Sequence, residues 1–212
     1  MFVLGLTGSI GMGKSATAGL FRESGVPVHD ADAAVHALYR GAAAPLIAEA
    51  FPGAVAQGAV DRGILGSLVL DRPGALRRLE AIVHPLVRAE ETRFLERIGR
   101  AGGRLAVLDV PLLFETGGQA RCDAVLVVTA SPQVQRERVL SRPGMTEERF
   151  RLILEKQMPD AEKRRRAHFL VDTGRGFPSA RAQVRGILRC LAGRSGRGAR
   201  GAGMREKLDH VA

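Results

Sequence analysis

The sequence of 212 residues has no tryptophan, no asparagine, one tyrosine and two cysteines. The scarcity of aromatic residues argues against a single-stranded nucleic-acid binder, because such proteins interleave aromatic with basic side chains. Cys122 and Cys190 lie far apart and outside any Cys-x-x-Cys pattern, which favours free thiols over a disulfide scaffold. Without asparagine, the chain also lacks the Asn-Lys-x-Asp element that guanine recognition usually needs.

Long apolar runs are also missing, and none approaches the roughly 20 residues of a membrane-spanning helix. The first apolar run stops at Thr7 with no basic residues before it, so it predicts a core strand rather than a signal peptide. With 45% hydrophobic and 25% charged residues, the composition is typical of globular proteins. We therefore expect a cytoplasmic protein without membrane attachment, built on one main α/β domain, as a monomer or weak homo-oligomer.

Residues 8–15 read Gly-Ser-Ile-Gly-Met-Gly-Lys-Ser, which is the Gly-x4-Gly-Lys-Ser pattern of a phosphate-binding P-loop. Glycines let the backbone turn its N–H groups toward phosphate oxygens, and the positive end of the following helix adds to the anion site. Lys14 can reach the β- and γ-phosphates, and the Ser15 hydroxyl can bind Mg²⁺. Because a strand pattern precedes the loop and a helix pattern follows it, the segment predicts nucleoside triphosphate binding.

The formal net charge of +10 is carried mostly by arginine, since only four basic residues are lysines. Residues 133–166 hold ten basic and six acidic residues, and residues 193–212 hold five basic and two acidic ones. Beside a P-loop, clustered arginines suit bidentate phosphate binding. We therefore expect ATP rather than nucleic acid as the partner, with a nucleic-acid-associated ATPase as the less favoured alternative.

Apolar runs followed by polar or glycine residues predict a parallel sheet covered on both faces, with ligands at the strand ends. The predicted strands span residues 2–7, 26–29, 105–108, 124–128 and 169–171. Between the second and third runs, about 70 residues rich in Ala, Leu, Arg and Glu predict an inserted lobe of short helices. The predicted helices of this lobe span residues 33–40, 44–51, 61–69, 73–83 and 85–100.

Two further predicted helices, residues 133–140 and 146–157, form a candidate lid, and Thr146 is placed to cap the second. A last helix is predicted over residues 179–191. The expected organisation is one kinase domain, residues 1–192, followed by a basic tail at 193–212 that we expect to be disordered. Within it the core spans about 1–32, 103–132 and 167–192, the lobe about 33–102 and the lid about 133–166.

A small chain with a P-loop, a helical insertion and an arginine-rich lid is typical of a kinase whose lid excludes water. Asp32 follows the second strand and can take the proton of an attacking hydroxyl, whereas Asp30 fits a helix cap better. Arg138 and Arg142, one helical turn apart, either clamp the γ-phosphate or form a solvated helix face. Asp109 is either a magnesium-side carboxylate or a turn residue. His84, before Pro85, either contacts substrate or marks a helix boundary.

Several segments resemble the dephospho-coenzyme A kinase family. They are residues 5–15, Asp30-Ala31-Asp32, Val83-His84-Pro85, Val110-Pro111-Leu112-Leu113-Phe114-Glu115, the pair Arg138 and Arg142, and Gln157. They cover about residues 3–191, and the second and fourth segments are far more discriminating than the P-loop. The resemblance implies ATP-dependent phosphorylation of the ribose 3′-hydroxyl of dephospho-CoA, the last step of CoA biosynthesis. It also implies a P-loop core with a helical CoA-binding lobe and a lid. Another nucleoside or nucleotide kinase is the nearest alternative.

The resemblance also implies roles for individual residues. The residues expected to bind ATP are Thr7, Gly8, Gly11, Met12, Gly13, Lys14, Ser15 and Ala16, and Ser15 is expected to bind Mg²⁺. The residues expected to bind the acceptor substrate are Asp32, His84, Leu112, Leu113, Phe114 and Glu115. Asp32, Lys14, Arg138 and Arg142 are the expected catalytic set. The chain departs from the family pattern at His168, usually aspartate, at Thr173, usually asparagine, and at Ala16, usually a hydroxyl residue.

Overall fold

The computed structural model describes residues 1–70 and 72–196, so most of the predicted tail lies outside the described residues. The chain divides into two compact units. Within the described part, residues 1–28 and 98–196 form the first unit, and His29–Arg97 form the second. The second unit begins and ends a few residues before the lobe predicted at about 33–102.

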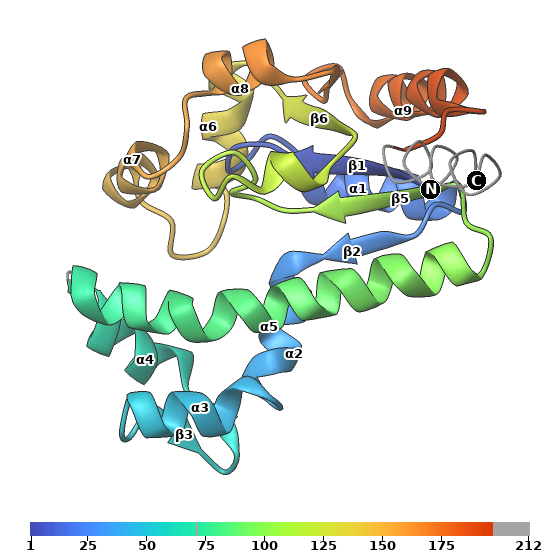
Figure 1. Ribbon diagram of the computed structural model, residues 1–212. Helices are drawn as coiled ribbons and strands as arrows, with labels where there is room; N and C mark the ends of the chain where they lie inside the picture. The colour runs from blue at the N-terminus through green and yellow to red at the C-terminus, as the bar shows by residue number, and fades with distance from the viewer. Residues whose placement is uncertain (71, 197–212) are drawn as a thin grey trace, which may run out of the picture. The chain divides into compact units, whose positions relative to one another are not determined.

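Four strands of a five-stranded sheet lie in the first unit, and the α/β class with a mostly parallel sheet is confirmed (Figure 1). The strands of the sheet are β1 (Phe2–Thr7), β2 (Val28–Asp30), β5 (Leu105–Asp109), β6 (Ala124–Thr129) and β7 (Phe169–Asp172), in the order β2-β5-β1-β6-β7. β1 pairs in parallel with β5 and β6, and β6 pairs in parallel with β7. The register places Leu6 beside Asp109, so that carboxylate reaches the sheet edge where the P-loop begins.

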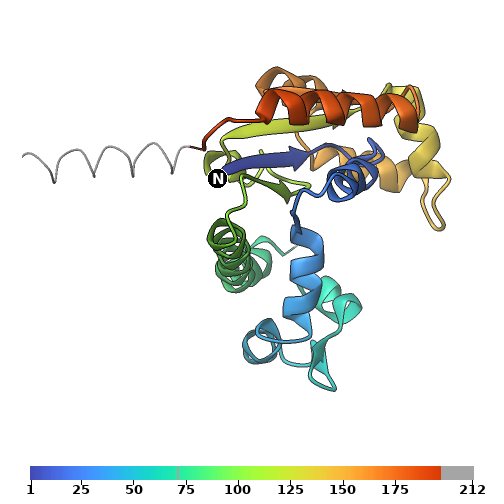
Figure 2. The same cartoon turned by 90° about the vertical axis from the view of Figure 1, so that its right-hand side faces the viewer.

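Helices cover this sheet because apolar residues recur on one side of each helix. Buried residues of α1 (Lys14–Glu23) and α9 (Phe177–Leu191) share one apolar cluster with β1, β6 and β7. Figure 2 shows α9 running along a face of the sheet. The remaining helices of this unit are η1 (Gly118–Arg121), α6 (Pro132–Leu140), α7 (Glu147–Glu155) and α8 (Asp160–Arg166). The Thr146 side chain accepts a hydrogen bond from the Arg149 N–H, so the predicted cap of the lid helix is confirmed.

The second unit packs short helices around its own apolar cluster, which includes Leu38, Ile47, Leu65 and Val83. Its elements are α2 (Ala31–Tyr39), α3 (Ala43–Ala50), β3 (Val55–Ala56), β4 (Ala59–Val60), α4 (Arg62–Val69) and α5 (Pro73–Arg100). The β3–β4 hairpin was not among the elements predicted from the sequence. Its two-residue turn has positive φ at both positions, 52° at Gln57 and 77° at Gly58, the backbone that favours tight hairpins.

The predicted break at His84-Pro85 is wrong, because α5 runs as one helix of 28 residues with Pro85 inside it. A proline inside a helix removes one hydrogen bond and costs about 3 kcal/mol. Val83 before it and Val87 after it both pack on the same apolar cluster, which offsets that loss. Among the residues described, no helix combines the length and the apolar character needed to cross a bilayer.

Candidate active site

The loop between β1 and α1 needs glycine at two positions. Gly11 and Gly13 have φ of 77° and 89°, in the left-handed region that disfavours side chains. A Cβ on Gly11 would lie 2.6 Å from the Val139 side chain, and one on Gly13 would lie 3.0 Å from the Thr173 hydroxyl. The predicted P-loop therefore has backbone that only glycine adopts readily, packed closely against α6 and the end of β7.

Side chains distant in the sequence hold this loop from outside. The Ile10 N–H donates to Gln157 Oε1 at 3.0 Å, and its carbonyl accepts from Gln135 Nε2 at 2.8 Å. The Thr173 hydroxyl donates to the Met12 carbonyl at 2.8 Å. These bonds fix the loop's shape while N–H groups at the start of α1 are free of intrahelical partners and suited to an anion.

Lys14 is the first residue of α1, and its ammonium lies 2.6 Å from Asp109 Oδ1. Asp109 is only 2% exposed, so the register of β5 delivers a buried carboxylate to the P-loop lysine. Thr7 is fully buried and its hydroxyl donates to the Pro111 carbonyl at 2.9 Å. Ser15 is exposed, which leaves its hydroxyl accessible to a metal ion. Asp109, for which the sequence left two readings, is thus a partner of Lys14 at the strand end.

Arg138 and Arg142 line one cavity of about 330 Å³ with Gly11, Gly13 and Ala16. Arg138 belongs to α6 and donates to the Thr173 hydroxyl at 2.8 Å and to its carbonyl at 2.9 Å. Arg142 lies beyond Leu140, where α6 ends, so the two arginines do not share a helix face as predicted. They nevertheless reach the same cavity, which also borders the P-loop.

The segment Leu112–Glu115 follows β5, and its residues have different surroundings. Leu112 is 40% exposed, whereas Leu113 and Phe114 are buried. A Cβ on Gly5 would lie 2.7 Å from Leu113, which shows how closely this leucine packs on β1. Leu113 and Phe114 thus occupy core positions, and their assignment to the acceptor side stays a prediction.

Glu115 pairs with Lys163, a lysine of α8 that the sequence analysis did not single out. The two charges lie 2.9 Å apart, as an ion pair rather than a well-aligned hydrogen bond, and Lys163 is completely buried. The Met158 N–H also donates to the Glu115 carboxylate at 2.8 Å. Burial alone would raise the pKa of Glu115, but the Lys163 ammonium and the backbone donors outweigh it and lower that pKa. The pair ties the segment after β5 to the lid region.

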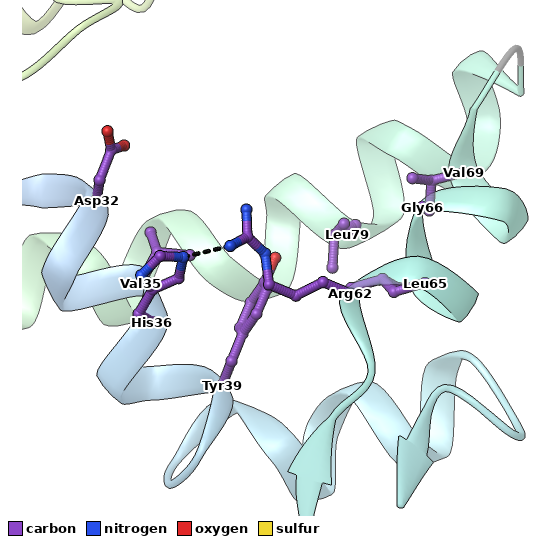
Figure 3. A pocket seen from close by; sticks show the side chains of 9 residues that line it. All are labelled: Asp32, Val35, His36, Tyr39, Arg62, Leu65, Gly66, Val69 and Leu79. Atoms are coloured by element: carbon purple, nitrogen blue, oxygen red, sulfur yellow. Dashed lines mark hydrogen bonds between the residues drawn. The ribbon is translucent and has the colours of Figure 1, made fainter. Parts of the chain in front are cut away.

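In the second unit, Asp30 caps α2 by accepting from the Ala33 N–H at 3.0 Å, as predicted. Asp32 is exposed in the first turn of α2 and lines a cavity of about 410 Å³. His36, Tyr39 and Arg62 line the same cavity (Figure 3). His84 is exposed on α5 and does not belong to the nine residues that line it. The site predictions for Asp32 and His84 thus fall on one unit, but only Asp32 faces its cavity.

Comparison with known proteins decides the family. The model of the family described as CoaE, dephospho-CoA kinase, matches residues 2–177. The chain belongs to the dephospho-CoA kinase family. It is 62% identical over 196 residues to a dephospho-CoA kinase of Mesorhizobium japonicum, covering 92% of this chain and all of the relative. It is 58% identical over 191 residues to the dephospho-CoA kinase of Agrobacterium fabrum, covering 90% of this chain and 98% of the relative.

Solved structures agree. The structure of TT1252 from Thermus thermophilus has a TM-score of 0.78 and 36% identity, covering 92% of this chain and 98% of that one. The dephospho-CoA kinase of Campylobacter jejuni, at 20% identity, has a TM-score of 0.61 and covers 89% and 96%, which shows the shared fold. The recognition made from the sequence segments is therefore confirmed.

Two of the three departures from the family pattern, His168 and Thr173, lie at opposite ends of β7, and the third, Ala16, lies in the first turn of α1. His168 precedes the strand, and its Nδ1 accepts from the Val125 N–H at 3.2 Å, next to the start of the parallel strand β6. That edge of the sheet is opposite the P-loop. Thr173 follows the strand and binds both Met12 and Arg138. Thr173 and Ala16 both line the cavity beside the P-loop, and the Thr173 hydroxyl binds the loop and an arginine at once.

Proposed function

We propose that this chain transfers the γ-phosphoryl group of ATP to the ribose 3′-hydroxyl of dephospho-CoA, giving CoA and ADP in the last step of CoA biosynthesis. Membership of the family, over residues 2–177, is the observation that carries this conclusion. The glycine backbone and the lysine of the P-loop support the donor side independently. A cytoplasmic location and a monomeric or weakly associating state stay predictions.

We assign ATP to the cavity beside the P-loop. The phosphates would lie against residues 8–13 and the start of α1, with Lys14 exchanging its contact to Asp109 for the β- and γ-phosphates. The apolar wall, which includes Leu20, Ala180 and the 47% exposed Phe177, offers a surface for a nucleobase. Arg138 and Arg142 supply positive charge in the same cavity.

The oxygen donors at the P-loop suit Mg²⁺, a hard cation that prefers oxygen ligands. The exposed Ser15 hydroxyl would hold it together with phosphate oxygens, and the Asp109 carboxylate stands beside Lys14 as a further oxygen donor. Among the described residues there is no group of three or more His, Cys, Asp or Glu side chains that could hold a metal by itself. The phosphates of ATP are therefore part of the proposed site. Bound there, Mg²⁺ would neutralise phosphate charge.

In the proposed reaction, Asp32 takes the proton from the ribose 3′-hydroxyl as its oxygen attacks the γ-phosphorus. A new oxygen–phosphorus bond forms, the bond to the β-phosphate oxygen breaks, and ADP leaves. Lys14, Arg138 and Arg142 stabilise the charge on the transferring group. The protein thus contributes position and charge, and the lid region excludes water from the reacting phosphate.

A coupled assay with ATP and Mg²⁺, scored for ADP and for CoA, tests this function. We expect dephospho-CoA to be preferred over nucleosides and nucleoside monophosphates by at least about 100-fold in kcat/KM, since an acceptor that lacks a group which the site binds loses that binding energy. Lys14→Ala serves as the inactive control. Preference for a nucleoside monophosphate would assign a different kinase activity. ATP hydrolysis that depends on added nucleic acid would instead favour the ATPase alternative.

A further inference from the structure

The cavity of the second unit changes in chemical character along its length (Figure 3). The carboxylate of Asp32 stands at one end, and the guanidinium of Arg62 lies in the middle. Leu65, Val69 and Leu79 form the other end. Its volume of about 410 Å³ falls within the range of small-molecule sites. The order along the cavity is therefore anion, cation and apolar surface.

Arg62 is held in place by neighbours on both sides. It is the first residue of α4, and the preceding Asp61 fixes the helix start by accepting from the N–H groups of Gly63 and Ile64 at 2.8 and 3.0 Å. One guanidinium nitrogen lies 2.5 Å from His36 Nε2. A guanidinium only donates hydrogen bonds, so His36 Nε2 is the acceptor in this contact. This partner orients Arg62 without cancelling its charge.

We propose that Arg62 binds the diphosphate of dephospho-CoA and that His36 is the positioning residue that aims it. This inference rests on the proposed function. Outward from its 3′-hydroxyl, the acceptor presents a ribose, a 5′-diphosphate and then a pantetheine arm, whose first carbon atoms carry two methyl groups ahead of a hydroxyl and an amide. Asp32, Arg62 and the apolar end of the cavity would bind the ribose, the diphosphate and these methyl groups in that order. Asp32 and His36 are four residues apart, about 6 Å along α2, which is comparable to the span of a ribose.

The five donors and planar fork of arginine match a diphosphate. Tyr39, whose ring also lines the cavity, stands near Arg62: burial raises the pKa of its hydroxyl, and the arginine charge opposes that rise. The phenol therefore stays neutral and available as a hydrogen-bond donor beside the cation. Val69 and Leu79 then meet the methyl groups of the arm beyond the diphosphate.

Arg62→Gln tests the assignment, with KM for each substrate and kcat measured in the full-length enzyme. We expect KM for dephospho-CoA to rise about 10- to 100-fold, the effect of losing a charged hydrogen bond, while KM for ATP stays within about twofold. Arg62→Lys keeps the charge and should recover part of the loss. Arg93→Gln is the matched control, because Arg93 is an exposed arginine of the same unit that pairs with Glu90. It should leave all constants unchanged.

His36 needs a readout that a merely structural role would not move. His36→Gln keeps an acceptor for Arg62 and should change KM for dephospho-CoA less than His36→Leu, with kcat and the melting temperature unchanged in both. An unchanged KM for dephospho-CoA in Arg62→Gln overturns the proposal, as does an equal rise in both KM values. Equal effects of the two His36 variants overturn the positioning role. A wild-type enzyme inactive on dephospho-CoA would instead refute the proposed function.

Discussion

The two units hold their candidate binding residues in different ways. In the first unit, a glycine backbone forms the phosphate site, and hydrogen bonds from Gln135, Gln157 and Thr173 fix it. In the second unit, the exposed side chains of Asp32, His36 and Arg62 line the cavity together with Leu65 and Leu79 of the apolar cluster. The proposed donor side is thus built on the main chain, to which Lys14, Arg138 and Arg142 add positive charge, and the proposed acceptor side is built from side chains.

This difference separates fold from chemistry. A phosphate site made of backbone groups binds any triphosphate. Because packed strands and helices shape this loop, a substitution in the loop disturbs their packing. Exposed side chains such as Asp32 and Arg62 can change without loss of buried contacts. We therefore expect substitutions in the second unit to alter acceptor use at constant stability. Substitutions in the supports of the first unit should alter stability or ATP use.

The largest effect is expected for Asp32→Asn. Loss of the proton acceptor should lower kcat by about 10²- to 10⁴-fold, the usual contribution of a general base. Because Asp32 is exposed and Asp30 caps the helix, the melting temperature should not change. Steady-state kinetics and a thermal melt measure both. Asp30→Asn is the control, since asparagine caps helices as well as aspartate does. A kcat within tenfold of wild type would remove Asp32 from the catalytic set.

A smaller effect, now on stability, is expected for Glu115→Gln in the first unit. The substitution leaves Lys163, which is fully buried, without its counter-charge. Removing one partner of a wholly buried pair costs about 3–5 kcal/mol, and we expect about 2–3 kcal/mol because Glu115 is partly exposed. Denaturant unfolding measures the loss. Glu147→Gln is the matched control. The pair of Glu147 with Arg136 is solvent-exposed, so this substitution should leave the free energy of unfolding unchanged within measurement error.

The pH dependence of this pair follows from the direction of the shift. The folded state lowers the pKa of Glu115 below its ordinary value of 4.5, so its contribution to stability is complete above about that pH. As the pH falls through the lowered pKa, the carboxylate takes up a proton and that contribution is lost. Free energies of unfolding of wild type and Glu115→Gln should therefore converge below pH 4.5. Curves that stay parallel down to acid denaturation would contradict the role of the charge.

Local features were predictable from the sequence, and long-range contacts were not. The P-loop, the buried strands and the caps at Asp30 and Thr146 depend on neighbouring residues, so a short segment determines them. The continuity of α5 through Pro85 depends on packing against distant helices, which overrides the local preference of proline. Hydrogen bonds between the P-loop residue Ile10 and two residues of the candidate lid, Gln135 and Gln157, join residues more than 100 positions apart.

The candidate site divides in the same way. Motif residues such as Lys14 and Asp32 were identified because a residue type at a fixed spacing has chemical meaning. Lys163 and Arg62 lie in no motif that the sequence analysis used, and their roles arise from the partners that folding brings to them. The buried Lys163 is followed by three arginines in the same helix, and only the packing distinguishes it from these exposed neighbours.

The smallest effect is expected for Gln157→Ala, and it tests whether the two units act separately. Gln157 accepts from the Ile10 N–H at 3.0 Å in the loop that would hold the phosphates. Loss of one neutral hydrogen bond is worth about 1 kcal/mol, so KM for ATP should rise about fivefold. KM for dephospho-CoA should not move, the opposite of the result expected for Arg62→Gln. Gln133→Ala is the control, because the Gln133 side chain donates a hydrogen bond to Glu137 on the exposed side of α6. Equal changes for ATP and dephospho-CoA in Gln157→Ala would mean that the lid residue acts on both substrates, and the division into a main-chain donor side and a side-chain acceptor side would fail.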